Sequence, residues 1–384
     1  MRILFVSHSS GAGEGSVKAL LSIVSELKHQ GHEIYIVFPE DGNAIEKVRA
    51  IDVHVVITKF YNSIVPKYTT LKSQIAVPYK VVRNTCQNFI TVKRLISLIH
   101  DFNIDLVHTN VGTVNVGFYA ARYCHVPHVW HIREMAEKIF LWHPLPSISY
   151  KKRLFRKNSY NIAITHEVKS FYQLSDSNSK VIYDGVFKAT SVPQIDLNKD
   201  NYLLFVGRIC EGKGTAWAVD AFLRVKDAFP EMQLLIVGTG NNAYARDLMD
   251  RCKEYVDSGR IKFLGYRDDV YDLMQKATAL IVPSELEGFG FITAEAMYNG
   301  CMVIGRNTGG TKEQFDNGVR LVGDEIGLRF STIDELVAQM DTVCRNGIKR
   351  YERMLSQAQK TVVTLYSIEK NAENILDIYH KLLK

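Results

Sequence analysis

The feature that most constrains the fold of this chain is an alternation of strand-like and helix-like segments that runs twice along its 384 residues. Each run opens with an apolar segment of strand length, Arg2–Ser7 and then Tyr202–Val206, followed by a glycine-containing turn and a segment with helical spacing. The polar segment Thr190–Asp200 contains a proline, separates the two runs and is typical of a linker. Two successive β/α alternations predict an α/β protein with two doubly wound domains that face a cleft.

The spacing of apolar residues predicts the other elements. Further strands are expected at Glu33–Phe38, Val53–Ile57, Leu106–His108, Val126–His131, Tyr160–Thr165, Val181–Ile182, Gln233–Val237 and Ile261–Phe263. Helices are expected at Ser16–His29, Thr215–Ala228, Ala243–Val256, Val270–Lys276 and Glu369–Leu383. The segment Tyr61–Thr91 shows no clear period, so we expect an insertion that helps to shape a substrate pocket.

The segment Ala279–Gly310 carries the most specific pattern in the chain. Its composition predicts a strand, a polar loop, a helix that begins at Phe291 and a second strand, which is a geometry that binds anions at the helix N-terminus. Glu287 lies in the loop, where its carboxylate can accept hydrogen bonds from sugar hydroxyls, and Glu295 lies one turn into the helix, within reach of a ribose diol. Carboxylates that only cap the helix are the alternative, which does not account for two glycines flanking Phe289.

Two cations follow the first strand of the second run. Arg208 and Lys213 lie where a strand ends and a helix begins, in the sequences Gly207-Arg208 and Gly212-Lys213-Gly214. A guanidinium and an ammonium at this position can neutralise a departing diphosphate without a metal. Two exposed loop cations with no ligand are the alternative reading.

The first run contains weaker candidates. Gly11–Gly15 follows the first strand and suits approach of the backbone to a phosphate at Gly13 or Gly15, although a sterically tight turn explains it equally well. Its spacing is not a dinucleotide fingerprint, but Glu40 and Asp41 after the second strand keep a nicotinamide site open.

A histidine and a basic segment complete the candidates of the first run. His131 ends an expected strand, so it faces the cleft and can donate a hydrogen bond to a donor hydroxyl; a structural histidine is the alternative. Residues 1–186 carry 22 Lys and Arg against 14 Asp and Glu, and the basic run Lys151–Lys157 could touch an anionic membrane or form a solvated helix face.

Several motifs of the second run fall in the order of a known family. FVGRICEGKG, LIVGTG, IKFLGYRDDVYDLMQKATALIVPSELEGFGFITAEAM and GCMVIGRNTGG, which lie within Phe205–Gly310, resemble the retaining glycosyltransferases of family 4 (glycosyltransferase group 1). The pair Glu287 and Glu295 matches the E-x7-E motif of that family. Weaker matches are DLVHTN, HIRE, VIYDGV and Tyr366-Ser367, and the first turn departs from the usual Gly-Gly-x-Glu pattern.

The resemblance implies the GT-B architecture of two Rossmann-like domains. Residues 1–186, with 368–384 packing back on them, would bind the acceptor, and residues 187–367 would bind a nucleotide sugar. It implies that His131, Arg208, Lys213 and Glu287 are catalytic and that the donor is held by Gly13, Gly15, Arg208, Lys213, Tyr266, Glu287, Phe289, Gly290, Phe291 and Glu295. Neither a cofactor nor a metal is expected.

The expected function is therefore transfer of a sugar from a nucleotide-diphosphate sugar to a hydroxyl of a saccharide or lipid-linked saccharide, with retention, in bacterial polysaccharide or glycolipid synthesis. A sugar-nucleotide epimerase or hydrolase, a nicotinamide-dependent dehydrogenase and a non-catalytic nucleotide-binding protein remain alternatives. Six scattered cysteines without metal-ligand spacing predict reduced thiols and a cytoplasmic location. The resemblance and the basic first run imply peripheral contact at the inner membrane face, and no nucleic-acid partner is expected.

Overall fold

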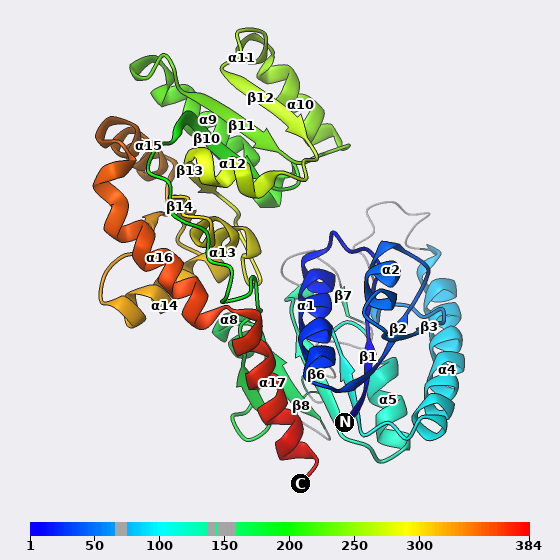
Figure 1. The fold of residues 1–384 in the computed structure, drawn as a ribbon. Helices are drawn as coiled ribbons and strands as arrows, with labels where there is room; N and C mark the ends of the chain where they lie inside the picture. Colours follow the sequence, from blue (N-terminus) through cyan, green and yellow to red (C-terminus); the bar gives the residue numbers. More distant parts are fainter. Residues whose placement is uncertain (66–74, 137–142, 145–151, 153–154, 156–158) are drawn as a thin grey trace. The chain divides into compact units, whose positions relative to one another are not determined.

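The computed structural model describes residues 1–65, 75–136, 143–144, 152, 155 and 159–384. The chain forms two compact units, which we call unit 1 (Met1–Gly185 with Ile368–Lys384) and unit 2 (Val186–Ser367) (Figure 1). Each unit is built on a parallel β-sheet with helices on both faces, which confirms the predicted α/β, doubly wound fold class. The division lies one residue from the predicted boundary, and the C-terminal segment belongs to unit 1.

The sheet of unit 1 has seven strands, and each neighbouring pair is parallel. Their spatial order is β3 (His54–Ile57), β2 (Glu33–Phe38), β1 (Arg2–Val6), β5 (Leu106–Thr109), β6 (His128–Ile132), β8 (Tyr160–Ala163) and β9 (Ser179–Val181). The chain order reverses direction at β1, so the carboxyl ends of β1 and β5 border the crevice at which α/β sheets bind ligands.

Alternate residues of β1 send apolar side chains into two different helical layers. Ile3 and Phe5 pack with α1 (Gly15–His29), α2 (Asn43–Arg49) and α17 (Ile368–Leu382). Leu4 and Val6 pack with α4 (Val77–Asp101) and α5 (Val116–Tyr123) on the other face. Because strand residues alternate in direction, a strand that is buried on both faces has a continuous apolar sequence. This pattern predicted β1.

Helix α4 is a correction to the sequence-based expectation. Tyr61–Thr91 shows no clear period and was expected to be an insertion, yet its described part includes the start of a helix that runs from Val77 through Asp101. Only Thr91, Leu95 and Ile99 of this helix are buried, all toward its C-terminal end. The first half of the helix buries no apolar stripe, so the periodicity that marks most helices is missing there.

The sheet of unit 2 has six parallel strands. Their order is β12 (Ile261–Gly265), β11 (Gln233–Val237), β10 (Asp200–Val206), β13 (Ala277–Val282), β14 (Val303–Arg306) and β15 (Leu328–Phe330). The reversal of chain order lies between β10 and β13, so the loops after these two strands meet at the same edge of the sheet. These are the loops that carry the predicted diphosphate and sugar ligands.

Helices cover both faces of the unit 2 sheet. They are α9 (Thr215–Val225), α10 (Ala243–Arg251), α11 (Lys253–Asp257), α12 (Val270–Lys276), α13 (Phe291–Tyr298), α14 (Gly309–Val322), α15 (Ile333–Asn346) and α16 (Glu352–Leu365). The single helix expected over Ala243–Val256 is two helices, because the α-helical hydrogen bonding is interrupted at Cys252. No helix in the described part of the chain is long and apolar enough to cross a membrane.

Three smaller features complete the described fold. A short antiparallel pair joins β4 (Ile64–Val65) to β7 (His143–Pro144), and α8 (His166–Phe171) precedes β9. Single turns of 3-10 helix occur at Glu211–Lys213, Lys226–Ala228 and Ile348–Tyr351. Each of the six cysteines is a free thiol, in agreement with the expected reduced state.

Candidate functional site

The loop after β10 is brought against the loop after β13 by a glycine. Gly214 has φ of +68°, and a Cβ at this position would lie 2.5 Å from the carbonyl oxygen of Pro283. Glu285 also donates its backbone N–H to the carbonyl of Gly212 at 3.2 Å. The Gly-Lys-Gly sequence therefore packs directly on the start of the loop that contains Glu287.

This packing places a cation beside the predicted sugar-binding acid. Lys213 Nζ lies 2.6 Å from Glu287 Oε1, and the two side chains are 28% and 13% exposed. The two residues are 74 positions apart in sequence, so only the parallel strands β10 and β13 bring them together. The pair is solvent-accessible enough for a ligand to reach it, yet buried enough for its charges to interact strongly.

A second glycine pair supports the backbone of the Glu287 loop. The N–H of Gly310 donates to the carbonyl of Glu287 at 2.9 Å. A Cβ at Gly309 would lie 2.8 Å from that same carbonyl oxygen, and a Cβ at Gly310 would lie 2.1 Å from the carbonyl oxygen of Phe289. The Gly-Gly sequence at the start of α14 is thus required by the close approach of two backbone segments.

The amide of Gln314, a residue that the sequence did not single out, holds the same loop from α14. Its Nε2 donates to the carbonyls of Phe289 at 2.6 Å and Gly290 at 3.0 Å. The Phe289 side chain is buried and contacts the rings of Phe291 and Tyr366 at centroid distances of 5.3 Å each. Phe289 and Gly290 therefore have their carbonyls occupied, and the backbone at the start of α13 presents N–H groups.

Helix α13 starts at a left-handed glycine and carries the second acid. Gly290, with φ of +85°, precedes Phe291 and gives α13 its N-terminus without a side-chain cap. Glu295 is buried, and Tyr271 donates its hydroxyl to Oε1 at 3.3 Å. Burial and the neighbouring carboxylate raise the pKa of Tyr271, so its hydroxyl stays protonated and donating.

Arg208 and Tyr266 lie after β10 and β12, two strands of the same sheet that are separated by β11. Arg208 is exposed immediately after β10, and Tyr266, which is 75% exposed, follows β12. Backbones are close at this edge, since a Cβ at Gly238 would lie 1.9 Å from the carbonyl oxygen of Gly207. Unit 2 thus brings the predicted residues Arg208, Lys213, Tyr266, Glu287, Phe289, Gly290, Phe291 and Glu295 to the loops and helix ends that follow its strands.

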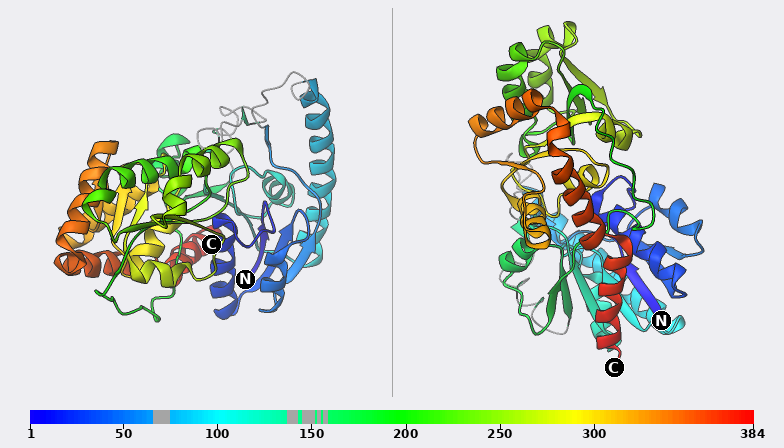
Figure 2. Two further views of the ribbon diagram at one scale, coloured as in Figure 1. Left: turned by 90° about the horizontal axis from the view of Figure 1, so that it is seen from above. Right: turned by 60° about the vertical axis from the view of Figure 1, so that its left-hand side comes forward.

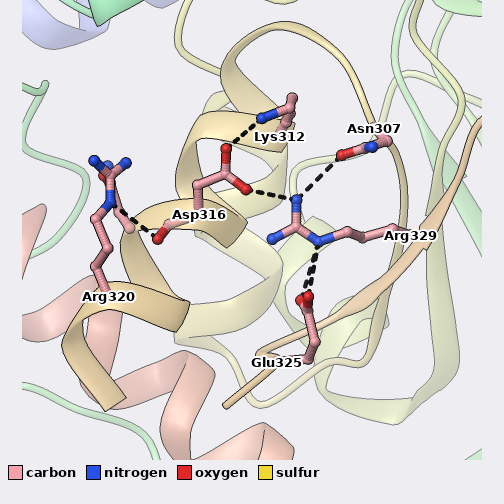
Figure 3. A network of polar contacts seen from close by, with 7 residues as sticks. Asn307, Lys312, Asp316, Arg320, Glu325 and Arg329 are labelled. Carbon is pink, nitrogen blue, oxygen red and sulfur yellow. Dashed lines mark hydrogen bonds and ion pairs between the residues drawn. The ribbon is translucent and has the colours of Figure 1, made fainter. Parts of the chain in front are cut away.

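An ionic network fixes α14, whose first turn supports this site. Arg329 of β15 donates to Asp316 Oδ1 at 2.8 Å and Glu325 at 3.0 Å, and Lys312 pairs with Asp316 (Figure 3). Burial favours a higher pKa for the Asp316 carboxyl, but its hydrogen bonds from Lys312 and Arg329 outweigh burial and lower that pKa. The network thus anchors α14 to the edge strand of the sheet.

The glycine turn of unit 1 is exposed and closed by a carboxylate. Glu14 accepts a hydrogen bond from the Ser9 hydroxyl at 2.6 Å and lies 3.2 Å from His8 Nε2, and these contacts, led by that with His8, lower its pKa. Gly15 begins α1, and a Cβ at Gly13 would meet nothing within 4 Å. Tight packing does not explain the glycine at position 13, and its role in phosphate binding stays a prediction.

The structure buries His131 in a polar network within unit 1. Its Nδ1 lies 3.2 Å from His108 Nε2 and 3.2 Å from a guanidinium nitrogen of Arg133. His108 Nδ1 in turn lies 2.5 Å from the hydroxyl of Tyr379 on α17. Arg133 also pairs with the buried carboxylate of Asp184. Arg133, His108 and Asp184 lie in the motifs HIRE, DLVHTN and VIYDGV, whereas Tyr379 lies in none of the quoted motifs.

The network fixes the proton of His131 on Nε2. Arg133 can only donate, so His131 Nδ1 accepts and the neutral ring carries its proton on Nε2. Burial, with repulsion from Arg133 and His108, holds the pKa of His131 well below its usual value. Nε2 is buried, lies 3.8 Å from Asp184 Oδ1 and has no hydrogen-bond partner among the described residues. His131 therefore holds a spare N–H donor.

The membrane contact of the basic run and the expected absence of a metal both stay predictions. The basic run Lys151–Lys157 lies outside them except for Lys152 and Phe155, so its membrane contact stays a prediction. Within the described ranges, no group of three or more His, Cys, Asp and Glu side chains is placed to hold a metal ion.

Two family models match consecutive parts of the chain. Glycosyltransferase Family 4 matches residues 13–187, and Glycosyl transferases group 1 matches residues 188–361. A glycosyltransferase of Methanocaldococcus jannaschii is 26% identical over 56% of this chain, and the match spans 57% of that relative's length. The N,N'-diacetylbacillosaminyl-diphospho-undecaprenol alpha-1,3-N-acetylgalactosaminyltransferase of Campylobacter jejuni is 20% identical over 83% of each chain.

Solved structures share the fold along the whole length. Anabaena HepE in complex with UDP gives a TM-score of 0.77 at 20% identity, covering 99% of this chain and 100% of that one. WaaG, a glycosyltransferase involved in lipopolysaccharide biosynthesis, gives 0.67 at 15% identity, with 98% and 99% covered. The two family models together span residues 13–361, and the chain belongs to the family 4 glycosyltransferases (glycosyl transferases group 1), with the GT-B fold.

Proposed function

We propose that this glycosyltransferase transfers a hexosyl group from a nucleoside-diphosphate sugar, bound by unit 2, to a hydroxyl group, with retention and without a divalent metal. The observation that carries the proposal is the contact of Lys213 with Glu287 beside the N-terminus of α13. A cation for the diphosphate, an acid for sugar hydroxyls and backbone N–H groups for an anion meet at one place. Anabaena HepE, solved with UDP-glucose, has the same fold and supports a uridine nucleotide as the first donor to test.

The proposed reaction needs one bond exchange at the anomeric carbon. The bond from that carbon to the diphosphate oxygen breaks, and its electron pair leaves with the diphosphate. The acceptor oxygen bonds to the same face of the sugar, and its proton passes to the departing diphosphate oxygen. Arg208 and Lys213 stabilise the charge that develops on this oxygen, which is where electrostatic catalysis gains most.

The other site residues position the substrates in this proposal. Glu287 accepts hydrogen bonds from the sugar, Glu295 accepts them from the ribose, and Tyr266 lies near the base. His131 donates through its spare Nε2–H to a donor hydroxyl, and Gly13 or Gly15 approaches a phosphate from unit 1. Neutral His131 can donate but carries no charge, which suits binding of a hydroxyl rather than of an anion.

We place the acceptor on unit 1 and infer that it is a saccharide or a lipid-linked saccharide. The Campylobacter relative is named for an acceptor carried on diphospho-undecaprenol, and WaaG for lipopolysaccharide biosynthesis. Both names support an acceptor used in bacterial polysaccharide or glycolipid synthesis.

The test measures donor binding first and turnover second. Nucleoside diphosphates and their sugars are screened for an increase in thermal stability, because a ligand stabilises the folded state by mass action. The best donor is then assayed with saccharide acceptors, with and without a chelator. The double variant R208A/K213A should lose about a thousandfold or more in kcat/KM while its melting temperature stays unchanged. Near-normal turnover by this variant would overturn the proposal.

A matched double variant controls for loss of positive charge. Lys253 and Arg353 are also exposed cations of unit 2, with side chains 76% and 79% exposed, and they lie outside the site. K253A/R353A should retain full activity. Consumption of the donor at the same rate with no acceptor would instead identify a hydrolase or epimerase.

A further inference from the structure

We propose that the outer face of α4 is a membrane-docking surface that binds anionic phospholipids. We call this surface the α4 stripe and define it by its exposed apolar side chains, each between 59% and 71% exposed: Ile75, Tyr79, Val82, Phe89 and Ile90. An exposed set of this size on one element requires a partner, since scattered single residues do not form a continuous face.

The residues of the α4 stripe lie on one side of the helix. The four members within α4 span an arc of about 100° on a helix with 3.6 residues per turn, with exposed Cys86 between them, and Ile75 lies two residues before the helix begins. From Tyr79 to Ile90 the stripe covers about 16 Å of helix at 1.5 Å per residue. Thr91, Leu95 and Ile99, which pack into unit 1, lie on the opposite side. The stripe therefore points away from the core of unit 1, at whose periphery α4 lies (Figure 2).

Polar contacts hold the middle of α4 in this orientation. Gln87 and Thr91 donate to the carbonyl of Lys59, at 2.9 and 2.7 Å. Asn88 exchanges two hydrogen bonds with the backbone of Tyr61, at 2.8 and 3.0 Å. The polar groups on the inner face of α4 thus bond to the segment after β3. These bonds fix the helix to unit 1 with its apolar outer face exposed.

The charge around the stripe selects the partner. The described residues between 53 and 100 include five Lys and Arg and no Asp or Glu. On α4 itself Arg83, Lys93 and Arg94 are exposed, and Lys93 lies 4.9 Å from the centre of the Phe89 ring. An apolar line flanked only by cations matches a surface with an apolar interior and phosphate headgroups.

The same features favour a membrane over the other occupants of an apolar face. A second copy of this chain would bring Arg83, Lys93 and Arg94 of two helices together with no acid on α4 before Asp101 to pair with them. Tyr79 and Phe89 are aromatic residues of the kind that anchor at the level of lipid headgroups. A helix docked in this way lies in the plane of the membrane surface.

The experiment measures partition of the full chain onto vesicles by flotation. We expect binding to vesicles of phosphatidylcholine mixed with phosphatidylglycerol, little binding to phosphatidylcholine alone, and weakening as salt rises. Y79E/F89E should reduce partition at least about tenfold, because two apolar anchors are replaced by charges that the lipid repels. The matched control is Y123E on α5, where Tyr123 is 70% exposed like Tyr79 but lies off the stripe.

A second reporter keeps the test decisive if a variant folds poorly. Cys86 is exposed, whereas the other five cysteines are buried or half-buried, so a polarity-sensitive fluorophore can be attached to it. Its emission should shift to the blue with anionic vesicles and remain constant with neutral ones. Equal binding to both vesicle types would overturn the proposal, as would loss of partition on replacing Lys151, Arg153 and Lys157 but not Tyr79 and Phe89. If a stripe variant lowers the mass of the protein measured by sedimentation but leaves vesicle binding unchanged, the stripe is a dimer interface instead.

Discussion

The side chain of Glu287 pairs with Lys213 and, in the proposed reaction, also accepts hydrogen bonds from the donor sugar. Without a nucleotide its carboxylate neutralises Lys213 at 2.6 Å, and a bound diphosphate would compete for the same ammonium. The ion pair therefore sets the balance between holding the leaving group and holding the sugar.

The variant E287Q separates these two roles. Removing the carboxylate frees Lys213, so we expect UDP to bind about twofold to fivefold more tightly, the range that a partly exposed ion pair is worth. The transfer rate should fall about a hundredfold, because the sugar loses its acceptor of hydrogen bonds. Calorimetry of UDP binding beside steady-state kinetics measures both. Weaker UDP binding by E287Q would contradict the competition.

Buried histidines make the stability of unit 1 depend on pH. Burial lowers the pKa of His128 to about 3 and places those of His108 and His131 well below their usual value. The unfolded chain binds protons at about pH 6.5, so the stabilisation is present above that pH and is lost as the pH falls through it.

His128 alone should account for about 2 kcal/mol of the free energy of unfolding lost between pH 8 and pH 5. Its ring nitrogens bond to the hydroxyls of Thr109 and Ser159, at 2.8 and 2.9 Å, so the neutral ring donates to one hydroxyl and accepts from the other. H128Q removes one titrating group. The free energy of unfolding of unit 1, measured in urea at each pH, should therefore fall less steeply between pH 8 and pH 5. An unchanged slope would show that His128 is already protonated in the folded protein.

At the scale of elements, glycines decide where the donor loops lie. Gly214 and Gly212 flank Lys213, but only Gly214 has positive φ and lies against Pro283; a Cβ at Gly212 would meet nothing within 4 Å. G214A should therefore destabilise unit 2 by about 2–4 kcal/mol, from strain and a backbone clash, and should also reduce donor binding. G212A should leave the melting temperature within a degree or two of the parent.

Local sequence predicted the strands and most of the helices because burial on a regular element repeats with a fixed period. The bounds expected for β2, β11 and α12 match the structure residue for residue. Helix α4 was missed because its apolar residues divide between the packed face and the α4 stripe, which hides the period. A helix that presents apolar residues to two environments cannot be recognised by a pattern that assumes one.

The site was predictable to the extent that its residues belong to local motifs. Lys213, Glu287 and Glu295 were singled out from short patterns, whereas their contacts depend on the register of β10 and β13. Gln314 and Tyr271 carry no local signal, because an amide and a hydroxyl on helices are ordinary surface residues until the fold brings them to the loop. The bond between His108 and Tyr379 spans 271 positions and follows only from the return of α17.

At the scale of the whole molecule, the two units differ in how the chain completes them. Unit 2 is one continuous segment, 186–367, whereas unit 1 takes its core residues Ile375, Ile378 and Tyr379 from α17. The isolated fragment 186–367 should therefore fold and bind a nucleoside diphosphate by itself. The fragment 1–185 should be unfolded or aggregated, and a peptide of residues 368–384 added in trans should restore its structure, as measured by circular dichroism. A stable, monomeric 1–185 fragment would show that α17 adds little to the core.

The return of α17 to α1 also has a consequence for synthesis on the ribosome. The strands of unit 1 are made first, yet the helix that covers Ile3 and Phe5 leaves the exit tunnel only after all of unit 2 has been translated. During that interval the nascent chain carries an open apolar face, which is the kind of surface that chaperones bind. A ribosome that stalls before residue 368 would release a protein in which unit 2 is complete and unit 1, which lacks α17, is a substrate for degradation.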